Sequence, residues 1–315
     1  MSFRQIEIPS LRRKLSNVML SPSSDAATME ERAFENYLRL GGDSIHLHGE
    51  GGEVSGRKAV GAWLSRRGLR PRFFLCSQIC HDGWNEVEQR PIDRFSPQAV
   101  LEDISTDLDL LATEYLDLVY FDDRPGVSFE PVIEAFAAEV RGGRVRAFGL
   151  RNCPAGRIRA IQQYAANLQL PGASAVFTTE LALAKAIGPL WPEYIPFDSQ
   201  LMDTVHSLGI AVFAHADGIN LGQCLYHRDN GAEPANSRWV RRWQHPENPR
   251  LIERVQSFAG ERRLTPREIN VAWMLNQNIH VMAVVASHEL LAHAAEYERA
   301  SQLLLNQTDL KLITG

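Results

Sequence analysis

The chain has 315 residues, of which 44% are hydrophobic and 23% charged, and its formal net charge is -5 at pH 7. This composition suits a globular chain with a sizeable core, and the negative balance argues against a nucleic-acid surface. We expect no membrane association, because no apolar run is long enough to cross a bilayer and the first residues lack a signal-peptide pattern.

Short apolar runs alternate with segments of helical periodicity along the whole chain. One helix start is marked clearly, because Ser96 is a favoured N-cap and Pro97 a favoured first helical residue. The predicted strands lie at 18–20, 44–47, 72–77, 116–121, 145–150, 173–177, 210–214 and 281–285, and the predicted helices at 26–40, 55–64, 97–111, 128–141, 154–168, 198–208, 251–261, 266–276 and 289–299. This alternation predicts an α/β protein with a (β/α)8 TIM barrel, formed by residues 1–315 as one domain.

Two longer segments, 81–95 and 216–244, are rich in polar and turn-forming residues and are expected to be irregular loops. The four cysteines form no CxxC pair, so neither a disulfide framework nor a zinc finger is expected. A reducing, cytoplasmic setting follows as the default, and the sequence leaves the oligomeric state open.

Polar residues stand where several predicted strands end. They include His46 and His48, Gln78, Asp122 and Arg124, Arg151 and Asn152, and His215. The carboxyl ends of parallel strands meet at one face of a barrel, and barrel enzymes carry their active sites there. We therefore expect a site for a small-molecule substrate at that face.

Five segments resemble the aldo-keto reductase superfamily. The family's "SLxRLxxDYIDLY" segment is similar to Leu101-Glu-Asp-Ile-Ser-Thr-Asp-Leu-Asp-Leu-Leu-Ala-Thr-Glu-Tyr-Leu-Asp-Leu-Val, and its "GKVRAIGVSN" segment is similar to Gly143-Arg-Val-Arg-Ala-Phe-Gly-Leu-Arg-Asn. Three other segments of the family resemble Gly41-Gly-Asp-Ser-Ile, Val54-Ser-Gly-Arg-Lys-Ala-Val-Gly and Thr265-Pro-Arg-Glu-Ile-Asn-Val-Ala-Trp-Met-Leu. The resemblance spans nearly the whole chain and implies the same barrel. It also implies the family's usual activity, NADPH-dependent carbonyl reduction by an Asp, a Tyr, a Lys and a His.

The positions of that catalytic tetrad carry other residues in this chain. By the resemblance, the Asp falls on His46, the Lys on Gln78 and the His on Asp122. The Tyr falls near Gly51, and there is no tyrosine between residues 45 and 57. Gln78 cannot replace the cation, because an amide carries no charge. We therefore expect a divergent member that has lost the redox tetrad.

The positions that hold the cofactor in the family are also changed. The Ser-Asn pair after the fifth strand is Arg151-Asn152, the amide-binding Gln falls on Glu180, and the aromatic that stacks on nicotinamide falls on Leu181. The late phosphate grip corresponds to 286–289, which contains no Arg or Lys, and Asp217 follows the seventh strand. A 2′-phosphate needs cations, so NADPH binding is expected to be weak or absent.

The replacements suggest a different chemistry. His46 and Asp122 form a competent acid/base pair, because an imidazole titrates near neutrality and a carboxylate can orient it. Arg124 or Arg151 is suited to hold a substrate carboxylate or phosphate. The sequence thus favours elimination, dehydration, isomerisation or cyclisation of a small metabolite, with an anionic group as its expected handle.

The substrate is expected to meet polar and aromatic side chains of the strand ends and of the loop after the third strand. These are His48, Gln78, His81, Trp84, Arg124, Arg151, Asn152, Glu180 and His215. A metal ion near His46 and His48, completed by Asp122, His215 and Asp217, is a minor hypothesis. The sequence also leaves open a non-catalytic binding or regulatory protein, and a residual NADPH-dependent reductase with a relocated proton donor.

Overall fold

Eight parallel strands form a closed barrel in the computed structural model, which describes residues 2–22, 27–48, 53–85, 89–170, 172–188, 194–216 and 241–315. The strands are β3 (Val18–Ser21), β4 (Ser44–Leu47), β5 (Phe74–Gln78), β8 (Leu118–Asp122), β9 (Phe148–Arg151), β10 (Ala173–Thr178), β11 (Ala211–His215) and β12 (Val281–Ala286). Each pairs with the next in this order, and β12 pairs with β3 to close the barrel. The predicted (β/α)8 barrel is confirmed.

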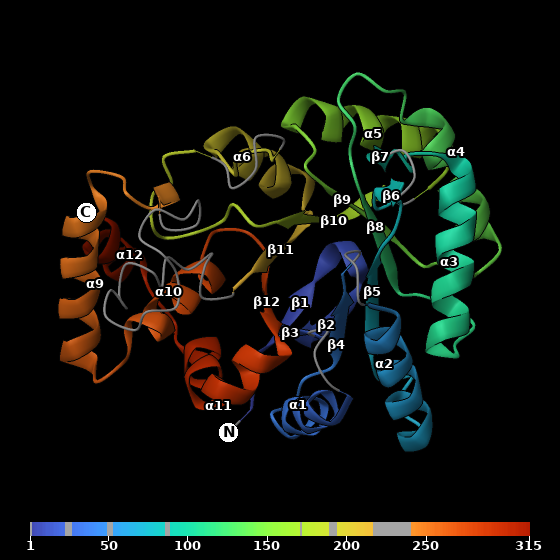
Figure 1. Ribbon diagram of the computed structural model, residues 1–315. Coiled ribbons are helices and arrows are strands. Elements are labelled where there is room, and N and C mark those ends of the chain that lie inside the picture. The colour runs from blue at the N-terminus through green and yellow to red at the C-terminus, as the bar shows by residue number, and fades with distance from the viewer. Residues whose placement is uncertain are drawn as a thin grey trace.

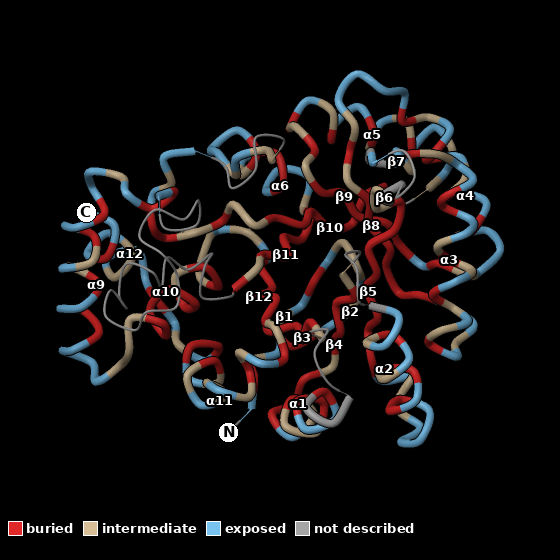
Figure 2. The backbone as a smooth tube through the Cα atoms, in the orientation of Figure 1, coloured by how far each residue is buried: buried red, intermediate tan, exposed pale blue. Residues whose placement is uncertain are grey.

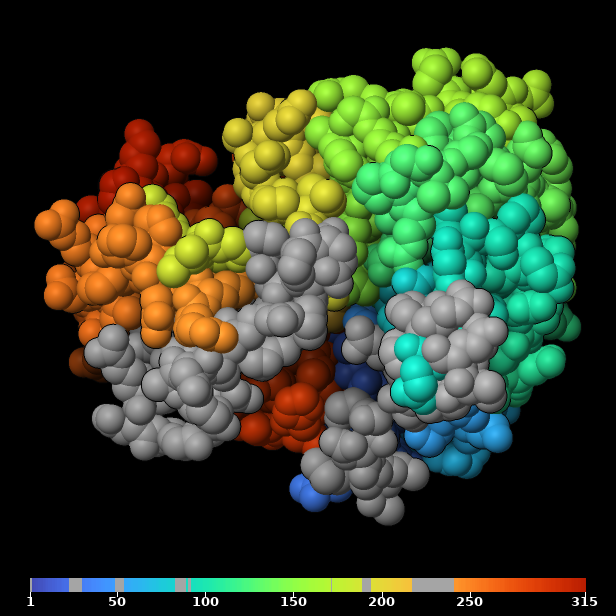
Figure 3. All heavy atoms as spheres, turned by 45° about the horizontal axis from the view of Figure 1, so that its top comes forward, coloured from blue at the N-terminus to red at the C-terminus, as the bar shows by residue number. Residues whose placement is uncertain are grey.

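Helices surround the strands as a ring that follows chain order, from α1 and α2 through α3, α4, α5 and α6 to α10 and α11 (Figure 1). The ring helices are α1 (Ala27–Arg39), α2 (Glu53–Arg67), α3 (Pro97–Leu111), α4 (Glu130–Arg141), α5 (Ala155–Asn167), α6 (Ser199–Leu208), α10 (Pro266–Leu275) and α11 (Ser287–Gln302), and α9 (Asn248–Arg262) and α12 (Gln307–Thr314) pack on each other outside α10. Figure 3 shows the orange residues of α9 and the green residues of α3 to α5 on opposite sides of the molecule.

An N-terminal hairpin covers the amino end of the barrel. Its strands, β1 (Gln5–Ile8) and β2 (Arg13–Ser16), are antiparallel and joined by the 3-10 turn η1 (Pro9–Leu11). Ile8 and Leu15 are fully buried in the cluster of side chains that fills the barrel interior. The hairpin therefore seals one end of the barrel with apolar side chains. It was not predicted from the sequence.

Local signals explain several of the helix ends. Ser96 accepts from the backbone N–H of Ala99, as predicted for this N-cap. Asp198 caps α6 in the same way, and Gly209 ends that helix in the left-handed conformation. Thr265 and Glu268 form a capping box at the start of α10.

The predicted loop at 81–95 proved partly wrong, because it contains a second hairpin, β6 (Gly83–Asn85) and β7 (Arg90–Ile92). Most of the other predicted loop, 217–240, lies outside the described residues. Helix α12 was not predicted, and α11 begins at Ser287, two residues before its predicted start.

Two clusters of buried side chains form an inner and an outer layer of the barrel core, and a third cluster lies among α9, α10 and α12. Figure 2 shows the barrel strands buried along their length, whereas the helices alternate between buried and exposed residues. The inner layer fills the barrel, and the outer layer lies between strands and helices. Within the described ranges, no helix is both long and apolar enough to span a bilayer.

Candidate active site

Five consecutive barrel strands bring polar side chains to the carboxyl end of the barrel, here called the mouth. Ser21, Gln78, Asp122 and Arg151 are the last residues of β3, β5, β8 and β9, and His46 is the last but one of β4. These strands are parallel neighbours, so their carboxyl ends meet at one face.

A line of hydrogen bonds joins four of these residues and a tyrosine. The Nδ1 atom of His46 lies 3.2 Å from Ser21 Oγ, and its Nε2 atom lies 2.7 Å from Tyr120 Oη. Tyr120 donates to Gln78 Oε1 at 3.3 Å, and Gln78 Nε2 donates to Asp122 Oδ2 at 3.4 Å. This line, which we call the mouth chain, runs from Ser21 to Asp122 across four strands.

The carboxylate at one end of the mouth chain sets the direction of every bond. An ionised Asp122 can only accept, so the amide nitrogen of Gln78 faces it and the amide oxygen faces Tyr120. The single phenolic proton of Tyr120 then points to Gln78, and the phenolic oxygen accepts from His46. Assigned in this way, Nε2 of His46 carries the ring proton, and Nδ1 presents a lone pair to Ser21.

His46 is fully buried, and this burial is the main cause that lowers its pKa well below the ordinary value of 6.5. His215 and His48 lower the pKa further, as do the guanidinium groups of Arg151 and Arg57. The imidazole is therefore neutral at pH 7, in agreement with a bare Nδ1.

Aromatic rings form the floor beneath the mouth chain. Tyr120 stacks on Phe177 with ring centroids 3.6 Å apart and an angle of 11° between the planes. The ring of His46 lies 5.4 Å from Phe177, and Phe213 meets Phe177 edge-on at 4.8 Å. Because these rings are buried and packed on one another, they hold Tyr120 and His46 in fixed orientations.

The predicted pairing of His46 with Asp122 is realised only through two intervening side chains. The carboxylate of Asp122 also accepts from Asn152 Nδ2 at 3.4 Å, and it lies 3.5 Å from Arg151 Nε. Arg151 in turn donates to Tyr194 Oη at 2.6 Å. Arg151 and Asn152 thus lie at the mouth, as predicted, and both contact Asp122.

His46, His48 and His215 form a triangle at the mouth. Their ring centroids are 5.5 to 5.8 Å apart, with the rings close to perpendicular. Over the part of the chain that the structure describes, no group of three His, Cys, Asp or Glu side chains is placed to hold a metal ion. Asp217, which was named among the candidate metal ligands, lies outside the described residues.

The loop after β5 is tied to the loop after β8 by an ion pair. Arg124 pairs with Asp82, and its Nε lies 3.9 Å from Asp93. His81 is half-buried, with Nδ1 2.9 Å from the carbonyl oxygen of Asp82. Trp84 lies in β6, and its side chain lies outside what the structure describes. The described ion pairs of Arg124 are thus with carboxylates of this loop.

Glu180 lies beyond the end of β10 and contacts Arg242. The two side chains are almost fully buried, and Glu180 Oε2 lies 2.7 Å from Arg242 Nη2. The other carboxylate oxygen accepts from Thr179 Oγ1 at 3.1 Å. Glu180 is therefore engaged in an ion pair at the position where the resemblance places an amide-binding Gln.

Two members of the mouth chain, Tyr120 and Ser21, were not predicted as site residues. Strand alternation carries the missing signal for Tyr120, because residues two apart face the same side, as Tyr120 and Asp122 do. Ser21 ends its strand as His46 nearly ends the neighbouring one, but no spacing in the sequence joins them.

Carboxylates cluster at the start of α11, where the resemblance places the family's late phosphate grip. Glu289 brings a negative charge into its first turn. Arg267 pairs with both Glu289 and Glu296, so two carboxylates offset its charge. The hydroxyl of Ser287 donates to the buried Glu30 at 2.8 Å. Carboxylates therefore offset the positive charge of Arg267, the guanidinium that pairs with Glu289 at this helix start.

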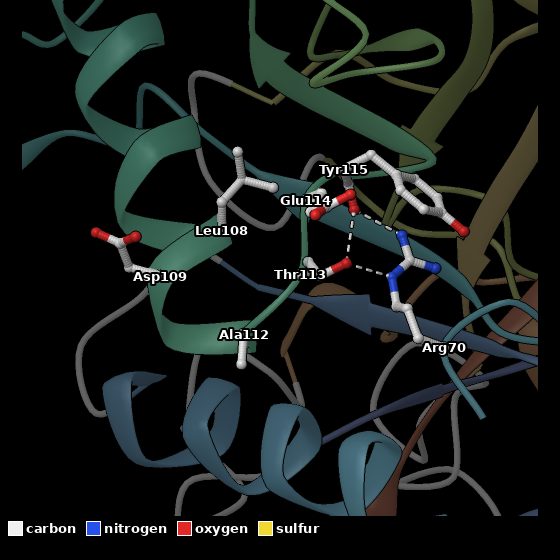
Figure 4. A pocket seen from close by; sticks show the side chains of 7 residues that line it. All are labelled: Arg70, Leu108, Asp109, Ala112, Thr113, Glu114 and Tyr115. Atoms are coloured by element: carbon white, nitrogen blue, oxygen red, sulfur yellow. Dashed lines mark hydrogen bonds between the residues drawn. The ribbon is translucent and has the colours of Figure 1, made fainter. Parts of the chain in front are cut away.

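A separate cavity lies at the amino end of the barrel, beside Arg70 and the segment from α3 to β8 (Figure 4). Arg70 donates to Thr113 Oγ1 at 2.8 Å and to the carbonyl oxygens of Phe73 and Tyr115 at 2.8 and 2.6 Å. It also lies 3.0 Å from Asp117 Oδ2. Because these contacts occupy the guanidinium, we assign Arg70 a structural role.

Comparisons with known proteins agree with this architecture. The model of the Aldo/keto reductase family matches residues 52–315. Aldo-keto reductase str7 of Strobilurus tenacellus is 24% identical over 79% of this chain and 68% of its own length. Aldo-keto reductase yakc [NADP(+)] of Schizosaccharomyces pombe is 22% identical over 85% of this chain and 76% of its own. An aldo/keto reductase from Klebsiella pneumoniae, solved with NADP and acetate, has a TM-score of 0.69 and 15% identity, covering 99% of this chain and 94% of that one.

Proposed function

The chain belongs to the aldo/keto reductase family, and from this premise we propose that it has lost the family's redox tetrad and catalyses proton transfer. The proposed reactions are elimination, dehydration, isomerisation or cyclisation of a small metabolite. His46 is the principal base. Asp122 acts at a distance, because it fixes which nitrogen of His46 carries the proton.

The directed mouth chain is the observation that carries this proposal. A general base needs a lone pair held in a fixed orientation within reach of the proton that it abstracts. His46 offers an unprotonated Nδ1, and its bond to Tyr120 fixes the orientation of the ring. Once Nδ1 takes a proton, the phenolic oxygen of Tyr120 still accepts from Nε2, so the imidazolium keeps its orientation.

Arg151 is the proposed contact for an anionic group of the substrate. Its guanidinium stands at the end of β9, next to Asp122 and Tyr194. The guanidinium lies 3.5 Å from Asp122, longer than a charge-assisted hydrogen bond, and in this proposal a substrate carboxylate takes the place of that contact.

The cofactor part of the proposal is that NADPH binds weakly or not at all. Glu289 at the start of α11 supports it, because this carboxylate and Glu296 offset the charge of Arg267 on α10. So does the ion pair that engages Glu180. We expect the quenching of protein fluorescence by NADPH to stay unsaturated up to millimolar cofactor. The Klebsiella pneumoniae aldo/keto reductase is a suitable positive control, since its solved structure holds NADP.

The experiment that tests proton transfer is hydrogen exchange from carbon in D2O. The full chain is incubated with a panel of small keto acids and hydroxy acids, and loss of carbon-bound proton signals is followed by NMR. We expect exchange of at least one panel member, slowed on the order of 100-fold in His46→Gln, the size typical of a general base. Equal exchange in the His46→Gln variant, or a micromolar dissociation constant for NADPH, would contradict the proposal.

A residual NADPH-dependent oxidoreductase is the second candidate. One observation favours it: the Schizosaccharomyces pombe relative is named for NADP(+). Tyr120 is then the candidate for the relocated proton donor, because its hydroxyl lies at the mouth. The NADPH titration separates the two candidates directly.

A further inference from the structure

Ser21 is the residue that the basic nitrogen of His46 faces. Its Oγ lies 3.2 Å from Nδ1, while Tyr120 Oη lies 2.7 Å from Nε2 on the far side of the ring. A nucleophile, a base and a third group that orients the base form the arrangement that activates a serine hydroxyl. Here a phenolic oxygen takes the orienting position, and the carboxylate of Asp122 stands two side chains further along.

On the Nδ1 side of His46, Ser21 is the least buried residue of the mouth chain. Its exposed fraction is 8%, whereas His46 and Tyr120 are fully buried. Ser21 is therefore the least buried of the three groups that would act together. The hydroxyl is held by a strand end paired in the barrel and not by a mobile tip, which favours a fixed attack geometry.

We propose that Ser21 is a nucleophile activated by His46, and that the mouth thereby transfers acyl groups from a small ester or thioester to water. This activity goes beyond the proposed proton transfer and rests on it in one respect, the bare Nδ1 of His46.

The steps of this acyl transfer balance with water as the second reactant. Ser21 Oγ attacks the acyl carbon while its proton moves to Nδ1. The bond from the acyl carbon to the leaving oxygen or sulfur breaks, and the departing alcohol or thiol takes that proton. Water then gives a proton to Nδ1 and attacks the acyl-serine. The ester bond to Ser21 breaks, the acid leaves, and the proton returns to Ser21.

The test is covalent labelling of the full chain by diisopropyl fluorophosphate. Attack by Ser21 forms a phosphorus–oxygen bond and releases fluoride and a proton. We expect one adduct per chain by intact mass, mapped to Ser21 by peptide sequencing, and labelling about 100-fold slower in His46→Gln. Ser257, an exposed serine on α9, is the internal control and should remain unlabelled.

Absence of an adduct at Ser21, or labelling of Ser21 no faster than of Ser257, would overturn the proposal. Both readouts come from the unaltered protein, so they hold even if the His46→Gln variant unfolds. Labelling at equal rates in a folded His46→Gln variant would also overturn it.

The outcomes remain distinct from those of the proton-transfer experiment. A His46-dependent adduct at Ser21 without any exchange of carbon-bound protons supports the nucleophile and contradicts the first function. Exchange without an adduct contradicts the nucleophile alone.

Discussion

The neutral state of His46 makes a quantitative prediction about stability and pH. Burial lowers the pKa of His46 in the folded protein, whereas in the unfolded chain the imidazole titrates near its ordinary value. Below pH of about 6.5 the unfolded chain therefore binds a proton that the folded protein excludes. Stability from this group is fully present above the unfolded pKa and is lost as the pH falls below it.

The magnitude follows from the linkage relation. A single group that cannot be protonated in the folded state lowers the free energy of unfolding by about 1.4 kcal/mol for each pH unit below the pKa of that group in the unfolded chain. Between pH 7.5 and pH 5.5, the free energy of unfolding should therefore fall because of His46 alone, by at most about 1.4 kcal/mol. In the His46→Gln variant this part of the pH dependence should disappear.

Urea unfolding at a series of pH values, followed by tryptophan fluorescence and circular dichroism, measures the effect as a difference between proteins. His288→Gln is the matched control, because His288 is exposed on α11. The free energy of unfolding of His288→Gln should depend on pH in the same way as that of the unaltered protein. If His46→Gln showed the same pH dependence as the unaltered protein, His46 would titrate alike in the folded and unfolded chain, and the lowered pKa of the buried imidazole would be refuted.

Two further changes test the packing around the mouth and at the opposite end of the barrel. Tyr120→Phe leaves the buried Nε2–H of His46 without its phenolic acceptor, and it should lower the free energy of unfolding by about 1–3 kcal/mol. Tyr115→Phe, at a half-buried tyrosine, is its control and should stay within about 0.5 kcal/mol of the unaltered protein in the same urea series. Arg70→Met removes the hydrogen bonds to Thr113, Phe73 and Tyr115, and we expect a loss of about 2–3 kcal/mol. The exposed Arg159 provides the matched Arg→Met change, and equal losses at both sites would refute the structural role of Arg70.

The barrel was predictable because its signals are local and repeated. Most strands are short apolar runs with polar residues at or after their ends, and several helices carry their own periodicity or caps. The strand starts were less predictable. The predicted strands at 116–121 and 145–150 begin with an isolated bridge between Leu116 and Val145, and the regular ladder starts only at Leu118 and Phe148. Beside this bridge, the side chain of Asp117 accepts a hydrogen bond from the backbone N–H of Leu75, which lies far from it in the sequence.

The sequence predicted which residues lie at the mouth, but not which side chains they contact. Strand ends identified His46, Gln78, Asp122 and Arg151, because parallel strands bring their ends together whatever the side chains are. The partners of each group depend on side-chain directions across the barrel, which no spacing records. For this reason Tyr120 was assigned to an apolar strand, and Arg124 to substrate binding, although it pairs with Asp82 in the neighbouring loop.

The placement of Asp122 decides what kind of help a carboxylate can give to His46. Two uncharged side chains separate them, and Arg151 lies 3.5 Å from the carboxylate, so little of the negative charge is left to stabilise an imidazolium. The carboxylate can still act through hydrogen-bond direction, because Asp122 accepts and never donates when ionised. An Asn at this position would fill the same space but allow either orientation of the Gln78 amide. In the reversed orientation Tyr120 would donate to His46 and the ring proton would move to Nδ1. Asp122 therefore matters to His46 as the group that keeps the basic nitrogen on the side of Ser21.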